Sequence, residues 1–144
     1  MLNFQTVICE LTGLPLANCS LLDEATAAAE AVTMFHGSRS RAQVKAEANT
    51  VFVDENVFAS TLAVIPTRMI PQGIQVVVGD YKKFEFTPDV FAAIVQFPNA
   101  DGSIEDYKEF VARAGAAGAK VGVAADLMSL VLLTPPGEWG ADIV

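Results

Sequence analysis

The sequence is poor in cysteine, histidine and basic residues, and each shortage excludes a class of protein. Its 144 residues include two cysteines, one histidine and nine lysines and arginines. Cys9 and Cys19 form no C-x-x-C pattern and are therefore predicted to be reduced thiols that do not bond to each other. His36 and two distant cysteines cannot build a metal cluster. These features predict no metal site and favour a cytoplasmic protein over a disulfide-stabilised secreted one.

The charge balance and the lack of long apolar runs exclude two kinds of partner. Seventeen acidic residues against nine basic ones give a net charge of −8. Nucleic acids and anionic membranes attract clustered lysine and arginine, so neither is an expected partner. Asp126 and Pro135 interrupt the most apolar region, which is too short to span a bilayer. The start, MLNFQTVICE, lacks the basic residues of a secretory signal.

What the sequence does contain is hydrophobic residues, 52% of the total, arranged as alternating strands and helices. The apolar runs TVFVD, IQVVVGD, FAAIVQF and KVGVAAD predict neighbouring, mostly parallel strands buried between helices. No linker divides the chain, so residues 1–144 are interpreted as a single α/β domain. A further strand is expected to begin at Ala141.

The helix predicted after residue 20 organises the rest of the chain. Ser20, followed three residues later by Asp23, resembles a helix-capping signal, and Gly37 is expected to end the helix in a left-handed conformation. A face of small side chains at helical spacing predicts close packing on the sheet; it consists of Ala25, Ala28, Ala29 and Val32. Other helices are predicted around residues 4–11, 58–69 and 103–114, the last capped by Ser103 and Asp106.

Three long segments resemble the glycine cleavage system P-protein family. They are NFQTVICELTGLPLANCSLLDEATAAAEA, VFAAIVQFPNADGSIEDY and VAADLMSLVLLTPPGEWGADIV. The resemblance covers nearly the whole chain and corresponds to an internal piece of the family's amino-terminal half. It implies part of the large domain of a fold-type I pyridoxal-phosphate enzyme.

The resemblance also implies an activity for the parent protein. Members of this family are glycine dehydrogenases (decarboxylating), oxidoreductases that use pyridoxal 5'-phosphate to decarboxylate glycine. They pass the aminomethyl group to the lipoylated H-protein. The expected partners are the carboxy-terminal half of the P-protein, H-protein, glycine and further copies in a homo-oligomer. The piece itself is expected to supply scaffold and interface, with no catalytic residue and no metal.

The candidate cofactor-binding residues are Ser20 and Asp126. By resemblance, Ser20 lies where the family's fold holds the phosphate, and Asp126 lies where an aspartate pairs with the pyridinium nitrogen. Asp126 equally suits the role of capping the turn that follows it. Asp54 and Asp80 also end predicted strands, as does Gln96, but the two aspartates are interpreted as structural, and Asp54 is expected to cap the helix that follows it. Because the family's N-terminal half is a degenerate copy, any pocket at Ser20 and Asp126 is expected to be vestigial or regulatory.

The Schiff-base lysine required by this cofactor is expected outside the chain. The five lysines lie in loops, on a helix, or at the amino end of a strand. Two alternatives remain open from the residues. One is a non-catalytic α/β module that binds a partner or a small anion, and the other is part of a different fold-type I decarboxylase.

Overall fold

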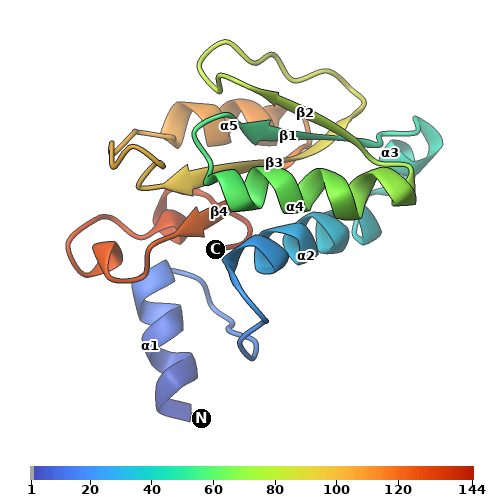
Figure 1. Cartoon of the computed structure of the whole chain (residues 1–144). Coiled ribbons are helices and arrows are strands. Elements are labelled where there is room, and N and C mark those ends of the chain that lie inside the picture. Colours follow the sequence, from blue (N-terminus) through green and yellow to red (C-terminus); the bar gives the residue numbers. More distant parts are fainter. Residues whose placement is uncertain (1) are drawn as a thin grey trace.

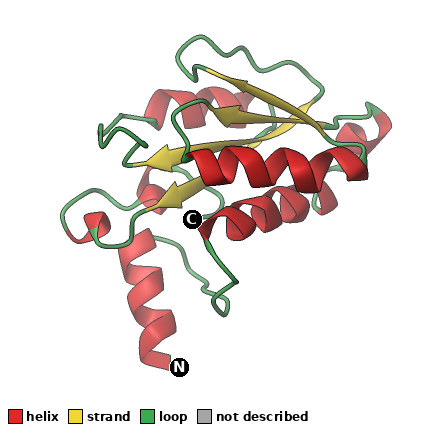
Figure 2. Ribbon diagram, viewed as in Figure 1, coloured by secondary structure: helices red, strands yellow, loops and turns green. Residues whose placement is uncertain are grey.

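The computed structural model describes residues 2–144 and places four parallel strands between two layers of helices (Figures 1 and 2). The strands are β1 (Thr50–Asp54), β2 (Gln75–Gly79), β3 (Val90–Phe97) and β4 (Lys120–Ala125), in the order β2-β1-β3-β4. All three pairings are parallel. The predicted α/β class and the four neighbouring strands are confirmed.

Helices cover both faces of this sheet. On one face lie α2 (Glu24–Gly37) and α4 (Ala59–Met69), which also pack against each other. On the other face α5 (Lys108–Ala116) packs with the aromatic segment 81–86. As connections, α4 joins β1 to β2 and α5 joins β3 to β4, the crossover arrangement that parallel strands require.

Strand position decides how well each apolar run is buried. Every residue of β3 is buried, because β3 has a strand on each side and helices on both faces. In contrast, β2 lies at the edge of the sheet, and Val78 is 49% exposed there. The prediction that all four runs are buried on both faces is therefore wrong for β2.

Both predicted ends of α2 need correction. The N-cap is Asp23, and its carboxylate accepts a hydrogen bond from the backbone N–H of Thr26, so Ser20 lies outside the helix. Gly37 is the last helical residue, and Ser38 closes the helix with φ −95°. The Ser38 N–H reaches the carbonyls of Met34 and Phe35 from an ordinary backbone conformation, so no left-handed glycine is needed.

The remaining elements are short. At the start of the chain α1 (Leu2–Thr12) ends at Gly13, which has φ 71°. The other helices are α3 (Arg41–Lys45), η1 (Ile70–Gln72), η2 (Ser129–Val131) and η3 (Pro136–Trp139). The strand expected from Ala141 is reduced to one parallel bridge, between Gly122 and Ile143.

The start of α5 also differs from the prediction. Tyr107 is its N-cap residue, and Asp106 accepts from the Lys108 N–H as expected. Ser103 instead closes the preceding turn, since its N–H donates to Asp101. The helix therefore starts later than residue 103.

The small-residue face of α2 makes a testable contribution to stability. Ala29 is fully buried and Ala28 is 8% exposed, as predicted. We expect Ala29→Leu to lower the free energy of unfolding by about 1–3 kcal/mol, because the longer side chain overpacks the helix–sheet contact. Urea denaturation measures this change. Ala112→Leu, at an exposed position of α5, is the matched control, and equal midpoints for both variants would contradict the packing argument.

The two cysteines provide a second test. Cys9 is half-buried on α1, Cys19 is exposed in the segment before α2, and both are free. We expect the intact mass of the chain to be the same with and without reductant. A loss of about two mass units without reductant, one hydrogen per bonded sulfur, would show a disulfide and contradict the placement of the two thiols.

Candidate functional site

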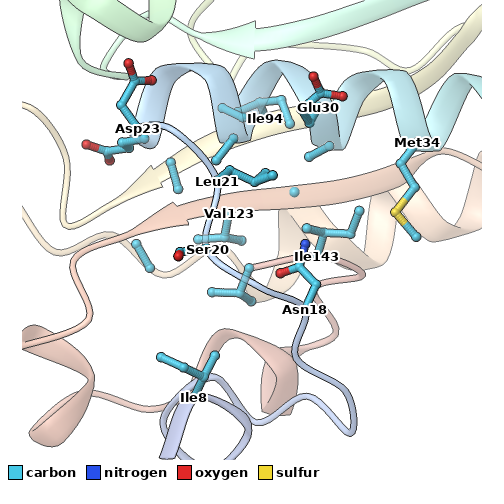
Figure 3. Close-up of a pocket in the computed structure, with 18 of the residues that line it drawn as sticks. Ile8, Asn18, Ser20, Leu21, Asp23, Glu30, Met34, Ile94, Val123 and Ile143 are labelled. Carbon is cyan, nitrogen blue, oxygen red and sulfur yellow. The ribbon is translucent and has the colours of Figure 1, made fainter. Parts of the chain in front are cut away.

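A pocket of about 600 Å³ opens between α2 and β4 (Figure 3). The N-terminal half of α2 forms one wall, β4 and the last residues of the chain form another, and the segment before α2 closes the bottom. Its apolar walls include Ala28, Ile94, Val123 and Ile143. This is the place where the sequence analysis expected a vestigial ligand site.

The charged groups of this pocket are all acidic. Asp23, Glu24 and Glu30 line it, and no lysine or arginine does. Figure 3 shows Asp23 just before the start of α2 and Glu30 farther along this helix. Glu30 forms an ion pair with Arg68 of α4, while the other two carboxylates have no cationic partner among residues 2–144. The negative electrostatic potential in this pocket therefore favours the binding of an apolar or cationic group over a phosphate.

The N-terminus of α2, a natural anion site, already holds an anion of its own. Asp23 Oδ1 accepts from the Thr26 N–H at 2.8 Å, and the Asp23 N–H donates to Thr26 Oγ1 at 3.2 Å. The hydrogen bond from the Thr26 backbone lowers the pKa of Asp23 below its usual value. A phosphate would have to displace this carboxylate.

The structure does not bring Ser20 and Asp126 together in one lining. Ser20 is exposed and lines the pocket. Asp126 lies between two lining residues, but its carboxylate accepts from the N–H groups of Met128 at 3.3 Å and Ser129 at 3.2 Å. Of the two roles considered for Asp126, capping the following turn is the one that the hydrogen bonds show.

The lysines lie away from the pocket. All five are exposed, and none lines it. Lys82 pairs with Glu105, Lys83 with Asp80 and Lys120 with Asp142. With an acidic lining, no lysine and a self-capped helix, these residues do not fit pyridoxal phosphate.

The other strand ends have different surroundings. Asp80 accepts from the Lys82 N–H and so closes a turn, in line with its structural interpretation. Gln96 is fully buried on the α2 side, where its Nε2 donates to Glu24 at 3.2 Å. Asp54 was expected to cap α4, and that is wrong: α4 has no side-chain cap, and Asp54 is fully buried.

Asp54 belongs to a buried polar cluster that the sequence analysis missed. The Tyr107 hydroxyl lies within hydrogen-bonding distance of Asp54 and Asn99. Tyr107 is the N-cap residue of α5 and is buried. Its polar partners come from β1 and from the turn after β3, and no local pattern connects those segments.

The described residues contain neither a metal-binding cluster nor a membrane-spanning helix. Within residues 2–144, no three His, Cys, Asp or Glu side chains converge as a metal site would require. Among the helices of the same range, none combines the length and apolar character needed to cross a bilayer.

Comparison with known proteins gives one family. A model described as "Glycine cleavage system P-protein" matches residues 1–144. Proteins named glycine dehydrogenase (decarboxylating) are 65% identical to the chain in Bacteroides fragilis and 52% identical in Nostoc punctiforme. They align with 100% and 99% of this chain, respectively, yet the chain spans only 15% and 14% of those relatives.

Solved structures agree with these sequence matches. A crystal structure of glycine decarboxylase (P-protein) of the glycine cleavage system, in inhibitor-bound form, superposes with a TM-score of 0.84 at 34% identity. The match covers 98% of this chain and 32% of that one. The crystal structure of MetB from Corynebacterium glutamicum superposes with a TM-score of 0.68. This match covers 95% of this chain and 34% of the MetB chain. At 16% identity, this second likeness shows the fold alone.

Proposed function

Because this chain belongs to the glycine cleavage system P-protein family, we propose that it is one part of a glycine dehydrogenase (decarboxylating). The observation that carries the proposal is the family match over all 144 residues, supported by 65% identity to the Bacteroides fragilis enzyme. Its fold is the partial large domain of the fold-type I pyridoxal-phosphate class. In this proposal residues 1–144 act as one α/β domain of the larger protein.

The proposed role of this part is scaffold and interface. The parent would bind pyridoxal phosphate and glycine elsewhere, release carbon dioxide, and pass the aminomethyl group to lipoylated H-protein. The cofactor would supply the electron sink for losing carbon dioxide. No lysine of this chain reaches its pocket, so the reacting amine would come from another segment.

Ser20 and Asp126 are proposed as remnants of a cofactor site. Ser20 lines the pocket in front of α2, and Asp126 follows the end of β4, at the sheet edge where α/β folds bind ligands. In this structure the groups around both residues are already engaged. Ser20 has the Asp23 carboxylate at the helix terminus beside it, and Asp126 is held by its own turn.

The interface part of the proposal rests on exposed apolar side chains. They gather on α1, on the segment before α2 and around η2, which contacts α1. Leu16, Leu22 and Leu132 are each at least 85% exposed. We propose that the carboxy-terminal half of the P-protein and a second copy of the parent cover this surface. A cytoplasmic location is also proposed, on the basis of the two free thiols.

Assay of the complete product of the gene tests this function. With pyridoxal phosphate and lipoylated H-protein, we expect it to release carbon dioxide from glycine carrying a carboxyl label. A folded, cofactor-loaded product that releases none would contradict the proposal. If it instead decarboxylates another amino acid, the alternative of a different fold-type I decarboxylase is correct.

A further inference from the structure

The buried cluster around Tyr107 contains more hydrogen-bond acceptors than the single proton of the Tyr107 hydroxyl can satisfy. Three oxygens lie near Tyr107 Oη: Asn99 Oδ1 at 2.6 Å, the Gln96 carbonyl at 3.2 Å and Asp54 Oδ2 at 3.3 Å. A tyrosine hydroxyl donates one proton, and the shortest contact identifies Asn99 as its acceptor. The amide nitrogen of Asn99 is directed to Ser103 Oγ, at 3.1 Å. The Tyr107 proton is therefore not available for the contact between Tyr107 Oη and Asp54 Oδ2. A hydrogen bond between these two oxygens requires a second proton, on Asp54.

The surroundings of Asp54 disfavour a negative charge. The side chain is fully buried, Tyr107 is 1% exposed and Asn99 is 5% exposed. No lysine or arginine is paired with it in residues 2–144, and its Oδ1 has no hydrogen-bond partner there. An unpaired buried carboxylate carries a large desolvation cost.

The charged groups that face the cluster add to this effect. Asp80, at the end of β2, repels a charge on Asp54, and Glu105 faces the tyrosines. Their cationic partners, Lys83 and Lys82, are themselves exposed. Burial raises the pKa of Asp54, whereas the N–H of Asn56, the Tyr107 hydroxyl and the N–H of Tyr81 oppose the rise. Neither of those N–H groups makes a hydrogen bond of good geometry to Asp54 Oδ1.

We infer that Asp54 keeps its proton in the folded chain under conditions in which the exposed carboxylates have lost theirs. It donates this proton to Tyr107 Oη, and Tyr107 donates its own to Asn99 Oδ1. The relay connects the end of β1 to the turn after β3 and to the start of α5. These two hydrogen bonds form a pH-sensitive connection at the carboxyl edge of the sheet. The connection is separate from the pocket beside β4, and the inference does not depend on the proposed function.

The sign of the pH effect follows from the protonation states. Above the ordinary aspartate pKa the unfolded chain is ionised at Asp54, while the folded chain still holds the proton. The stabilisation from this group is therefore present at low pH and is lost as pH rises through the folded-state pKa. Within that window, each pH unit lowers the Asp54 contribution to the folding equilibrium constant about tenfold.

Infrared spectroscopy of the chain at about pH 5.5, where ordinary carboxylates are ionised, tests the inference. We expect the carbonyl band of a protonated carboxylic acid, and we expect it to vanish in Asp54→Asn. Asp80→Asn is the matched control and leaves the band in place, because a hydrogen bond from the Lys82 backbone lowers the pKa of Asp80. Absence of the band from the wild-type chain overturns the inference, whatever the variant does.

Urea unfolding between pH 4 and 8 supplies a second readout. In Asp54→Asn the amide can donate to Tyr107 Oη in place of the acid proton. We expect this variant to match the wild-type chain at the acidic end and to be more stable at the alkaline end. The reverse order, with the variant less stable than the wild-type chain at pH 8, would show that the folded chain stabilises the ionised Asp54 carboxylate, and would overturn the relay.

Discussion

The 144-residue chain alone, mixed with pyridoxal phosphate and glycine, will show no lysine-bound cofactor band and release no carbon dioxide. The reason is the lining of the pocket beside β4, which holds three carboxylates and no lysine. Asp23 already occupies the helix terminus where a phosphate would bind. A single helix terminus contributes about 0.3–1 kcal/mol per charge at exposed sites, too little to hold the cofactor alone.

The matched control for this experiment is the complete product of the gene, treated in the same way. We expect absorbance from a lysine-bound cofactor there, and glycine-dependent release of carbon dioxide once lipoylated H-protein is added. Stoichiometric cofactor binding by the isolated chain, with the same spectrum as the complete product, would contradict the scaffold role.

Among substitutions of glycine by alanine, the one at Gly137 in η3 is expected to have the largest effect on stability. A Cβ built on Gly137 would lie 2.5 Å from the carbonyl carbon of Gly13 and 2.8 Å from the Thr12 carbonyl oxygen. Both are backbone atoms at the end of α1 and cannot rotate away. We expect Gly137→Ala to lower the free energy of unfolding by about 3 kcal/mol or more, because η3 must separate from α1.

The control for Gly137 is a glycine with free space around it. A Cβ at Gly115, inside α5, meets nothing within 4 Å. We expect Gly115→Ala to raise the free energy of unfolding by about 0.5–1 kcal/mol, the usual gain on replacing a helical glycine. Chemical denaturation of both variants measures the difference. Equal stabilities would mean that η3 does not rest on the end of α1.

The sheet was predictable because strand runs and helix spacing are local properties. TVFVD and FAAIVQF carry their apolar pattern in consecutive residues, and both strands are buried along their whole length. Which run lies at the edge is decided by the order β2-β1-β3-β4, and nothing within IQVVVGD encodes that order. The start of α2 was predicted less well. Ser20 and Asp23 are both residue types that cap helices, but the reciprocal hydrogen bonds of the cap join Asp23 to Thr26.

The candidate site likewise has features that local sequence predicts and features that depend on packing between distant segments. Asp126 could be placed at the end of a strand from sequence, and its turn-capping role was one of two roles considered. The acidic lining of the pocket was not expected, because Glu30 reaches it only through the packing of α2 beside β4. The Asp54–Tyr107–Asn99 cluster joins residues 53 and 8 positions apart, a separation that no periodicity reveals.

One labelling experiment tests the central claim, that this chain belongs to a glycine dehydrogenase without supplying its reacting amine. The complete product of the gene, loaded with pyridoxal phosphate, is reduced with borohydride and digested, and the modified lysine is identified by mass spectrometry. We predict one stoichiometric label, on a lysine outside residues 1–144. A label on Lys45, Lys82, Lys83, Lys108 or Lys120 would contradict the account.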